Sequence, residues 1–264
     1  HYHLAAINIF CKALRMADVN GCRQEFPAAY VATVKHMIEF YSNVCFPDYS
    51  NPCFSDAKLG NRSAEVGNYQ DWLKIYPDCE WIRYYATEGR EGSPLSYLSH
   101  GALDSGFFTF RNGWKQDATV MVVKAGPKGE WHCQPDNGTF ELWFNGRNLF
   151  PDSGSYVYAG DDEVMKLRNW FRQTSVHNTL TLDEKNLQTT ESVTRLWQPE
   201  GNEQILVTEN PHYEDLKHRR SVFFVDQAYF VIIDEAVGNA KGTVNLNYNL
   251  CEGTVHVDGK SNTL

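Results

Sequence analysis

Residues 130–152 read EWHCQPDNGTFELWFNGRNLFPD. Within them, residues 139–144 (TFELWF) alternate in polarity and are rich in aromatic side chains, which favours a β-strand. An Asn-Gly pair follows at 145–146, and Asn-Gly between two such runs is the strongest short signal for a β-hairpin. The stretch therefore predicts a hairpin within a sheet.

Polar side chains flank this hairpin. His132, Gln134 and Asp136 come directly before the predicted strand. His132 and Gln134 are two residues apart, so we expect them to project on one side of the chain. The hairpin should carry Asp152 back toward the same end. A histidine, an amide and a carboxylate are therefore predicted to gather at one edge of a sheet.

The first ninety residues have helical periodicity, and the rest of the chain has the alternation of strands. A helix is predicted over residues 2–17 and another after Pro27, followed by a long loop at 46–68 that is rich in turn-forming residues. Shorter helices are predicted at 69–76 and 79–87, and a linker at 88–94.

Beyond the linker, many short strands with turn signals between them predict an antiparallel β-sandwich. The predicted strands are 106–111, 118–124, 139–144, 155–158, 178–182, 193–197, 204–208, 220–225, 229–234 and 243–250. The fold class is thus α+β with two domains: helices over 1–90 and a sandwich over 95–264.

Composition limits the classes of partner. The 264 residues carry a formal charge of -9, which argues against nucleic acid. No apolar run approaches the ~20 residues of a membrane span. Lys166, Arg168 and Arg172 are close enough in sequence to attract a polyanion locally, but a solvated charged face is the preferred interpretation of them.

The seven cysteines are odd in number and form no CxxC pair, so neither a zinc ribbon nor a redox pair is indicated. Cys45 and Cys53 are candidates for a disulfide across a proline-containing loop. Free thiols at both positions are the alternative.

Three positions outside the 132–136 cluster bear on chemistry. Tyr2 lies at the start of the first predicted helix, where it is either a structural residue or an acid–base group. Asp152 and His177, with one further oxygen donor, would make a metal site of nitrogen and oxygen ligands. A hydrogen-bonded polar network between neighbouring strands is the alternative for these residues.

Four motifs together resemble the heparinase III group of the heparinase II/III-like superfamily (polysaccharide lyase family 12), in particular enzymes of Bacteroidetes. They are HCQPDNGTFEL at 132–142, PDSGSYVY at 151–158, MKLRNWFRQT at 165–174 and HNTLTLD at 177–183. The resemblance covers the whole chain. It implies the end of an incomplete α/α toroid followed by an antiparallel β-sandwich, with both ends of this chain lying inside a longer protein.

The resemblance also implies roles for site residues. Tyr2 and His132 match catalytic positions, while Asp152 and His177 match metal-binding positions. Gln134 stands where heparinase II relatives have a second histidine, so the implied divalent ion, a structural one, is calcium or manganese as readily as zinc. The family's catalytic asparagine is expected upstream of Tyr2.

The implied activity is β-elimination on heparan sulfate at glucosamine–uronate linkages. The implied protein is a periplasmic or secreted monomer with an acidic glycosaminoglycan as its partner. A non-catalytic glycan-binding segment, or a lyase acting on alginate or chondroitin, are the alternatives.

Overall fold

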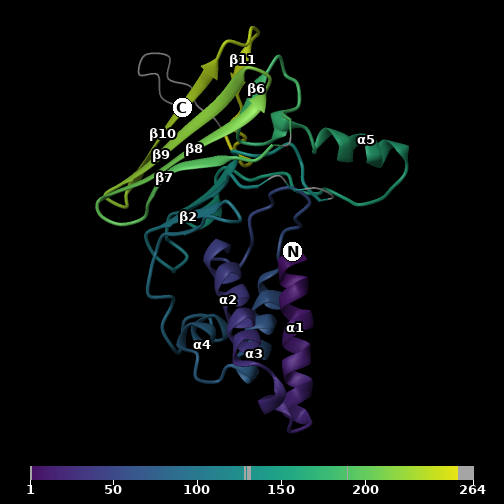
Figure 1. Cartoon of the computed structure of the whole chain (residues 1–264), viewed down its shortest axis with the longest axis vertical. Helices are drawn as coiled ribbons and strands as arrows, with labels where there is room; N and C mark the ends of the chain where they lie inside the picture. The colour runs from purple at the N-terminus through teal and green to yellow at the C-terminus, as the bar shows by residue number, and fades with distance from the viewer. Residues whose placement is uncertain (1, 128, 130–131, 189, 255–264) are drawn as a thin grey trace.

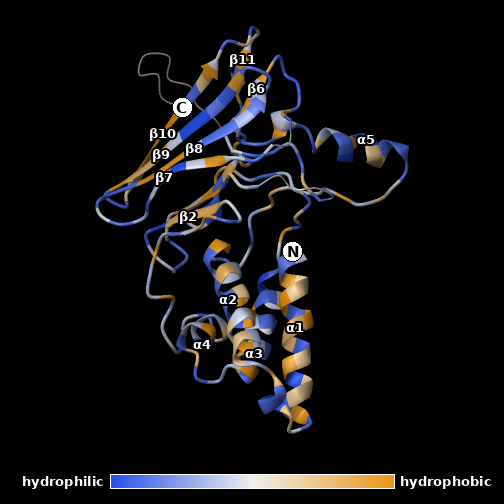
Figure 2. Cartoon of the chain, viewed as in Figure 1, coloured by the Kyte–Doolittle hydropathy of each residue, from blue (hydrophilic) through white to orange (hydrophobic). Residues whose placement is uncertain are grey.

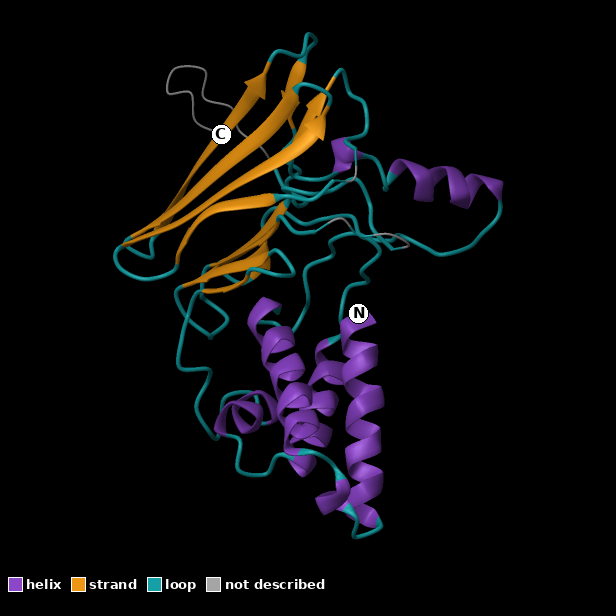
Figure 3. Cartoon of the chain, viewed as in Figure 1, coloured by secondary structure: helices purple, strands orange, loops and turns teal. Residues whose placement is uncertain are grey.

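The structure, a computed structural model, describes residues 2–127, 129, 132–188 and 190–254. Helices form one end of the molecule and strands the other, with the start of the first helix turned toward the strands (Figures 1 and 3). The predicted order, helices first and an antiparallel sheet region second, is confirmed. The predicted domain limits, 1–90 and 95–264, remain predictions.

The helical part has four helices in the described residues. They are α1 (Tyr2–Val19), α2 (Ala28–Val44), α3 (Arg62–Ile75) and α4 (Glu80–Ala86), with a short 3-10 turn at Arg23–Glu25. Apolar side chains at helical spacing, such as Ile7, Leu14 and Ile38, face a shared core with Trp72. The predicted loop at 46–68 was too long, because Asn61 caps α3 by accepting a hydrogen bond from the Ala64 amide.

The strands form two main antiparallel sheets. One has the order β1-β2-β3-β4-β5, the other β10-β9-β8-β7, and a small third sheet pairs β11 with β6. Their bounds are β1 (His100–Ala102), β2 (Phe107–Arg111), β3 (Val120–Lys124), β4 (Phe140–Phe144), β5 (Arg147–Asn148), β6 (Leu180–Leu182), β7 (Val193–Gln198), β8 (Glu203–Tyr213), β9 (Leu216–Val225), β10 (Tyr229–Gly238) and β11 (Val244–Leu246).

Apolar side chains from the two main sheets fill the space between them. The buried set comprises Phe108, Phe110, Met121, Val123 and Phe140 from the five-stranded sheet and Leu206, Val222 and Phe224 from the four-stranded sheet. The opposite face of the five-stranded sheet, including Val120 and Val122, packs on the helical part. Because both of its faces are covered, β2 is hydrophobic along most of its length (Figure 2).

The predicted hairpin is present. Trp143 pairs with Asn148 across the turn, and Asn145 and Gly146 both have positive φ, 47° and 86°. Two adjacent residues with positive φ are what a type I′ hairpin turn requires.

The predicted strand at 155–158 is wrong. Gly154 and Tyr156 have left-handed φ of 60° and 54°, and the Ser155 carbonyl accepts a hydrogen bond from the Arg168 guanidinium, as does that of Val157. Arg168 belongs to α5 (Asp162–Trp170), a helix absent from the sequence prediction that projects away from the sandwich (Figure 1). Arg168 is buried, so it fits neither of the two interpretations that the sequence left open, a local polyanion site and a solvated charged face.

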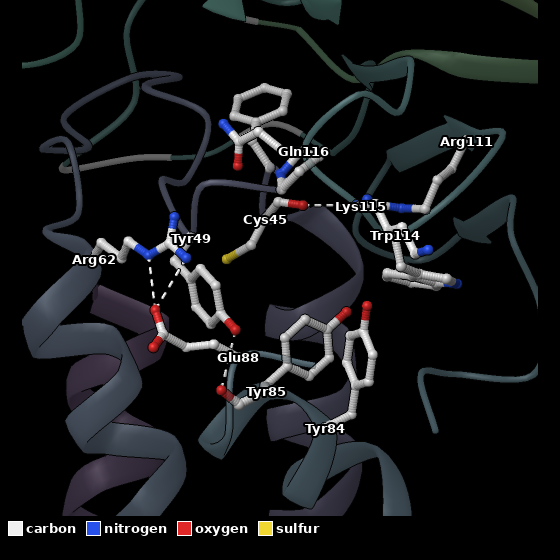
Figure 4. A pocket seen from close by; sticks show the side chains of 12 residues that line it. Cys45, Tyr49, Arg62, Tyr84, Tyr85, Glu88, Arg111, Trp114, Lys115 and Gln116 are labelled. Atoms are coloured by element: carbon white, nitrogen blue, oxygen red, sulfur yellow. Dashed lines mark hydrogen bonds and ion pairs between the residues drawn. The ribbon is translucent and has the colours of Figure 1, made fainter. Parts of the chain in front are cut away.

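Arg111, at the end of β2, joins the two parts. Its buried guanidinium donates to the carbonyls of Asn43 and Cys45 at the end of α2 and lies 4.2 Å from the centre of the Trp114 ring. Beside this joint is a hollow of about 200 Å³, into which the Tyr84 and Tyr85 hydroxyls point (Figure 4). A cation at a helix C-terminus is favourable, so this contact ties α2 to the sandwich.

The structure also bears on the cysteines and on membrane spans. All seven cysteines are free, so Cys45 and Cys53 form no disulfide. Of the helices in the described residues, none combines the length and apolar character of a bilayer span.

The sandwich interior also holds a buried histidine, His212 on β8. Burial, reinforced by His218 and Arg220 nearby, holds the pKa of His212 well below its ordinary value of 6.5. Unfolding therefore lets His212 take up a proton below pH 6.5, which the folded state resists. Its contribution to stability is complete above pH 6.5 and declines as the pH falls.

We predict that His212→Gln flattens the acid side of the stability profile. Between pH 6.5 and 5.0 the wild-type free energy of unfolding should fall more steeply than that of the variant, by at most about 1.4 kcal/mol per pH unit. Urea unfolding at several pH values measures both slopes. His36→Gln, a change at an exposed histidine, is the matched control and should keep the wild-type slope; equal slopes for wild type and His212→Gln would contradict the assignment.

Candidate active site

Tyr2 and His132 meet where the helical part faces the sandwich. Tyr2 starts α1, and its ring centre lies 4.1 Å from that of His132 with the planes at 32°. Both side chains are substantially exposed, Tyr2 at 44% and His132 at 51%. They border a hollow of about 190 Å³ whose other walls include Phe40, Asn51 and Phe107. A phenol and an imidazole are thus accessible side by side.

The His132 ring is held by a carboxylate from the helical part. His132 Nδ1 lies 3.2 Å from Oδ2 of Asp56, a residue in the loop between α2 and α3. Asp56 is 4% exposed, and its Oδ1 accepts a hydrogen bond of 3.2 Å from Gln134 Nε2. His132 and Gln134, expected to project on one side of the chain, both contact the Asp56 carboxylate. Both precede β4 in a loop, and only Gln134 is buried.

Tyr158 lies next to Tyr2. The two hydroxyls are 2.9 Å apart, and the Tyr158 hydroxyl donates to the Asp56 carbonyl at 2.9 Å. Lys58 Nζ lies 4.6 Å from the centre of the Tyr158 ring. Partial burial, with the Tyr2 hydroxyl and Asp56 close by, raises the pKa of Tyr158, so at neutral pH this group is a neutral hydroxyl.

A second cluster contains the three predicted metal ligands. His177 Nδ1 is 2.8 Å from Asp152 Oδ2, and both side chains are buried. Gln134 Nε2 donates to the Gly154 carbonyl, and the Gly154 amide donates to Asp152 Oδ1, so one glycine links Gln134 to this pair. Burial alone would lower the pKa of His177, but the Asp152 carboxylate raises it above its ordinary value.

Two atoms of this cluster are buried without hydrogen-bond partners among the described residues: His177 Nε2 and Gln134 Oε1. Since Nδ1 faces a carboxylate, it carries the ring proton, and Nε2 presents a lone pair. The described residues contain no group of three His, Cys, Asp or Glu side chains spaced for a metal. The candidate donors are His177 Nε2, the Asp152 carboxylate and the Gln134 amide oxygen, and a set of nitrogen and oxygen donors fits a divalent ion.

The buried carboxylate of Asp136 holds the loop that carries Asp56. Asp136, fully buried, pairs with Lys124 and accepts hydrogen bonds from the Ser55 amide and hydroxyl at 2.7 and 2.9 Å. Burial alone would raise the pKa of Asp136, but the Lys124 ammonium holds it below its usual value. Asp136 is therefore an anchor of the loop at Ser55.

The structure thus places the predicted residues in two neighbouring sets: Tyr2 with His132, and Gln134 with Asp152 and His177. Sequence reasoning missed Asp56 and Tyr158. Asp56 is 76 residues from His132 in the chain, within a loop that the sequence predicts only from its turn-forming residues. Tyr158 lies within a quoted motif, but it was assigned to a strand.

Two family models match the chain. Residues 1–84 match the heparinase II/III N-terminus, and residues 96–264 match the heparinase II/III-like C-terminal region. The chain belongs to the heparinase II/III-like family.

Among its relatives, a heparin-sulfate lyase of Bacteroides stercoris is 68% identical over 97% of this chain, and one of Pedobacter heparinus is 44% identical over 98%. A solved heparinase III structure matches with a TM-score of 0.95 at 66% identity over 98% of this chain, and heparan sulfate lyase HepC from Pedobacter heparinus with 0.91 at 44% over 95%. The chain spans only 38% and 40% of the two lyases, and 41% and 39% of the two solved chains.

We predict that Lys124→Met destabilises the protein by about 3–5 kcal/mol, because it leaves the Asp136 carboxylate buried without its cation. Urea unfolding at pH 7 measures the loss. Lys185→Met is the matched control, because Lys185 is exposed and pairs with Asp183 at 3.5 Å; it should change stability by less than about 1 kcal/mol. A Lys124→Met variant as stable as the control would contradict the role of the pair.

Proposed function

We propose that this chain is part of a polysaccharide lyase that cleaves heparan sulfate by β-elimination at glucosamine–uronate linkages, leaving 4,5-unsaturated uronate ends. The observation that carries the proposal is the contact between Tyr2 and His132, two accessible groups able to move protons, at the border of one hollow. The heparin-sulfate lyases named above support it by their high identity to this chain.

The reaction has three chemical requirements. The uronate carboxylate must be neutralised by strong hydrogen bonds before the C5 proton becomes acidic. A base must then remove that proton, and an acid must protonate the departing O4 oxygen. Each positioned proton transfer contributes roughly 10²–10⁴-fold to the rate.

We assign Tyr2 as the acid that protonates O4. For glucuronate, H5 and the leaving oxygen lie on one face of the sugar, so the same phenolic oxygen also serves as the base. As the phenolate, its proton having passed to His132, it removes H5 and then passes that proton to O4. Tyr158 hydrogen-bonds this hydroxyl. Because the Tyr158 proton is donated to the Asp56 carbonyl, Tyr158 accepts from Tyr2 and holds the phenolic group in position.

His132 has the second role. Its ring lies against the ring of Tyr2. From this position it assists removal of the C5 proton or stabilises the tyrosinate by taking up positive charge. Neutralisation of the uronate carboxylate needs hydrogen-bond donors in addition to these two residues.

We further propose that Gln134, Asp152 and His177 hold one divalent ion. Gln134 Oε1 and His177 Nε2, both buried and unpartnered among the described residues, support this with the Asp152 carboxylate. The ion would supply structural stability, because it would fix the segment between Gln134 and Asp152. An oxygen-rich set favours calcium or manganese over zinc, which prefers histidine and cysteine.

We predict that Tyr2→Phe in the full-length enzyme abolishes the rise in ultraviolet absorbance of the unsaturated product from heparan sulfate, because the variant has no phenolic proton to transfer. Tyr30→Phe is the matched control, since the Tyr30 hydroxyl lies on the helical part and, within the described part of the chain, bonds only the Phe10 carbonyl at 3.3 Å. It should keep wild-type activity.

The same assay run on alginate and chondroitin decides the polymer. Product from heparan sulfate alone is expected. Binding of heparan oligosaccharides without product, or product only from another polymer, would overturn the proposed function.

For the ion, we predict that a chelator lowers the melting temperature and that calcium, manganese or zinc restores it. An ion at 100 times its Kd stabilises the folded state by about 2.7 kcal/mol. Asp152→Asn should reduce the ion-dependent shift strongly, whereas Asp215→Asn, in the exposed turn between β8 and β9, should keep it. No shift in the wild-type protein with any of the three ions would contradict the site.

A further inference from the structure

We propose that Asp56 is the positioning residue for His132: its carboxylate fixes the imidazole in one orientation and one tautomer, with Nε2 free to act in the cleft. This inference deepens the proposed function and rests on it for the role of His132. The juxtaposition itself, of a buried carboxylate and an accessible imidazole, is a feature of the structure.

Asp56 reaches His132 through both its main chain and its side chain. The Asp56 amide donates to the His132 carbonyl at 3.2 Å, while the carboxylate faces Nδ1 of the ring. Two contacts between the same pair of residues fix the distance and the angle between them. The His132 side chain is about half exposed, so apart from the Tyr2 ring it has few neighbours that would restrain its rotation.

The remaining partners of Asp56 restrain its carboxylate. Oδ1 accepts from Gln134 Nε2 at 3.2 Å, and the Arg168 guanidinium lies 3.4 and 3.5 Å from the two oxygens. A buried carboxylate needs such donors, because an unpaired charge in the interior is strongly unfavourable. With Oδ1 engaged by Gln134, Oδ2 is directed at His132.

This arrangement selects the tautomer. An ionised carboxylate only accepts hydrogen bonds, so Nδ1 must carry the proton and Nε2 must carry the lone pair. A carboxylate that holds one ring nitrogen of a histidine in this way orients the imidazole for the reaction at the other nitrogen.

The same residue also places the phenols. The Asp56 carbonyl accepts from the Tyr158 hydroxyl, which in turn bonds the Tyr2 hydroxyl. Asp56 therefore contacts His132 by its amide and carboxylate and reaches Tyr2 through Tyr158 by its carbonyl. Substitution of the side chain should disturb His132 while leaving the main-chain contact to Tyr158 in place.

The test compares Asp56→Asn with Asp48→Asn in the full-length enzyme. Asp48 lies in the same loop but binds only the Ser50 amide and hydroxyl among the described residues. For Asp56→Asn we expect kcat on heparan sulfate to fall on the order of 10- to 100-fold with KM within about twofold of wild type. Asp48→Asn should match wild type in both. A kcat unchanged in Asp56→Asn, or a loss confined to KM, would overturn the proposal.

A second measurement needs no substrate. The ¹⁵N chemical shifts of the His132 ring report which nitrogen carries the proton. Wild type, Asp48→Asn and the conservative variant Asp56→Glu should show a proton on Nδ1, and Asp56→Asn should move toward the other tautomer, because its amide can donate to Nδ1. An unchanged tautomer in Asp56→Asn would overturn the proposal.

Thermal unfolding checks that each variant is folded. If Asp56→Asn does not fold, Asp56→Ser takes its place and is measured in the same way. This variant deletes the carboxylate and keeps the main-chain contact. If wild type proves inactive on heparan sulfate while the ring shifts change as expected, the proposed function fails and the positioning role stands.

Discussion

The loop between α2 and α3, residues 46–61, is the element on which the site depends, because buried charge on the sandwich fixes it in place. Arg111 holds the end of α2, where the loop begins, and Asp136 with Lys124 holds Ser55 within it. Buried ionic groups tolerate little displacement, since a lost partner leaves an unpaired charge in the interior. These contacts hold the loop against the sandwich, and Asp56 therefore lies next to His132.

The fixed position of this loop explains how one site can combine residues from the helical part and from the sandwich. Tyr2 is positioned by α1, whereas His132 and Gln134 precede β4 in a loop. Neither set of residues alone brings a phenol to an imidazole. Asp56 in the loop connects the two. Its carboxylate faces the imidazole of His132, and its carbonyl accepts from Tyr158, which lies next to Tyr2.

The sequence predicted those features that depend on local pattern. The Asn145-Gly146 turn and most of the strands were correct, because alternation and turn residues act over a few positions. Residues 155–158 were wrong because their carbonyls bind Arg168 from α5 rather than a neighbouring strand. The hairpin pattern singled out His132, Gln134 and Asp152, whereas the catalytic and metal-binding roles came from motif resemblance and remain proposals. Asp56 had no local signal, since its function arises from contacts with residues 76 and more positions away.

The central claim is that Tyr2 and His132 act on one glycosidic linkage. The most direct test is a structure of the full-length protein, carrying Tyr2→Phe to prevent turnover, with a heparan-sulfate tetrasaccharide bound. The account predicts that the residue 2 ring and His132 Nε2 flank the same O4 oxygen and C5 carbon, with Asp56 still on Nδ1. An oligosaccharide bound in order elsewhere, with neither side chain in contact with a glycosidic oxygen, would contradict it.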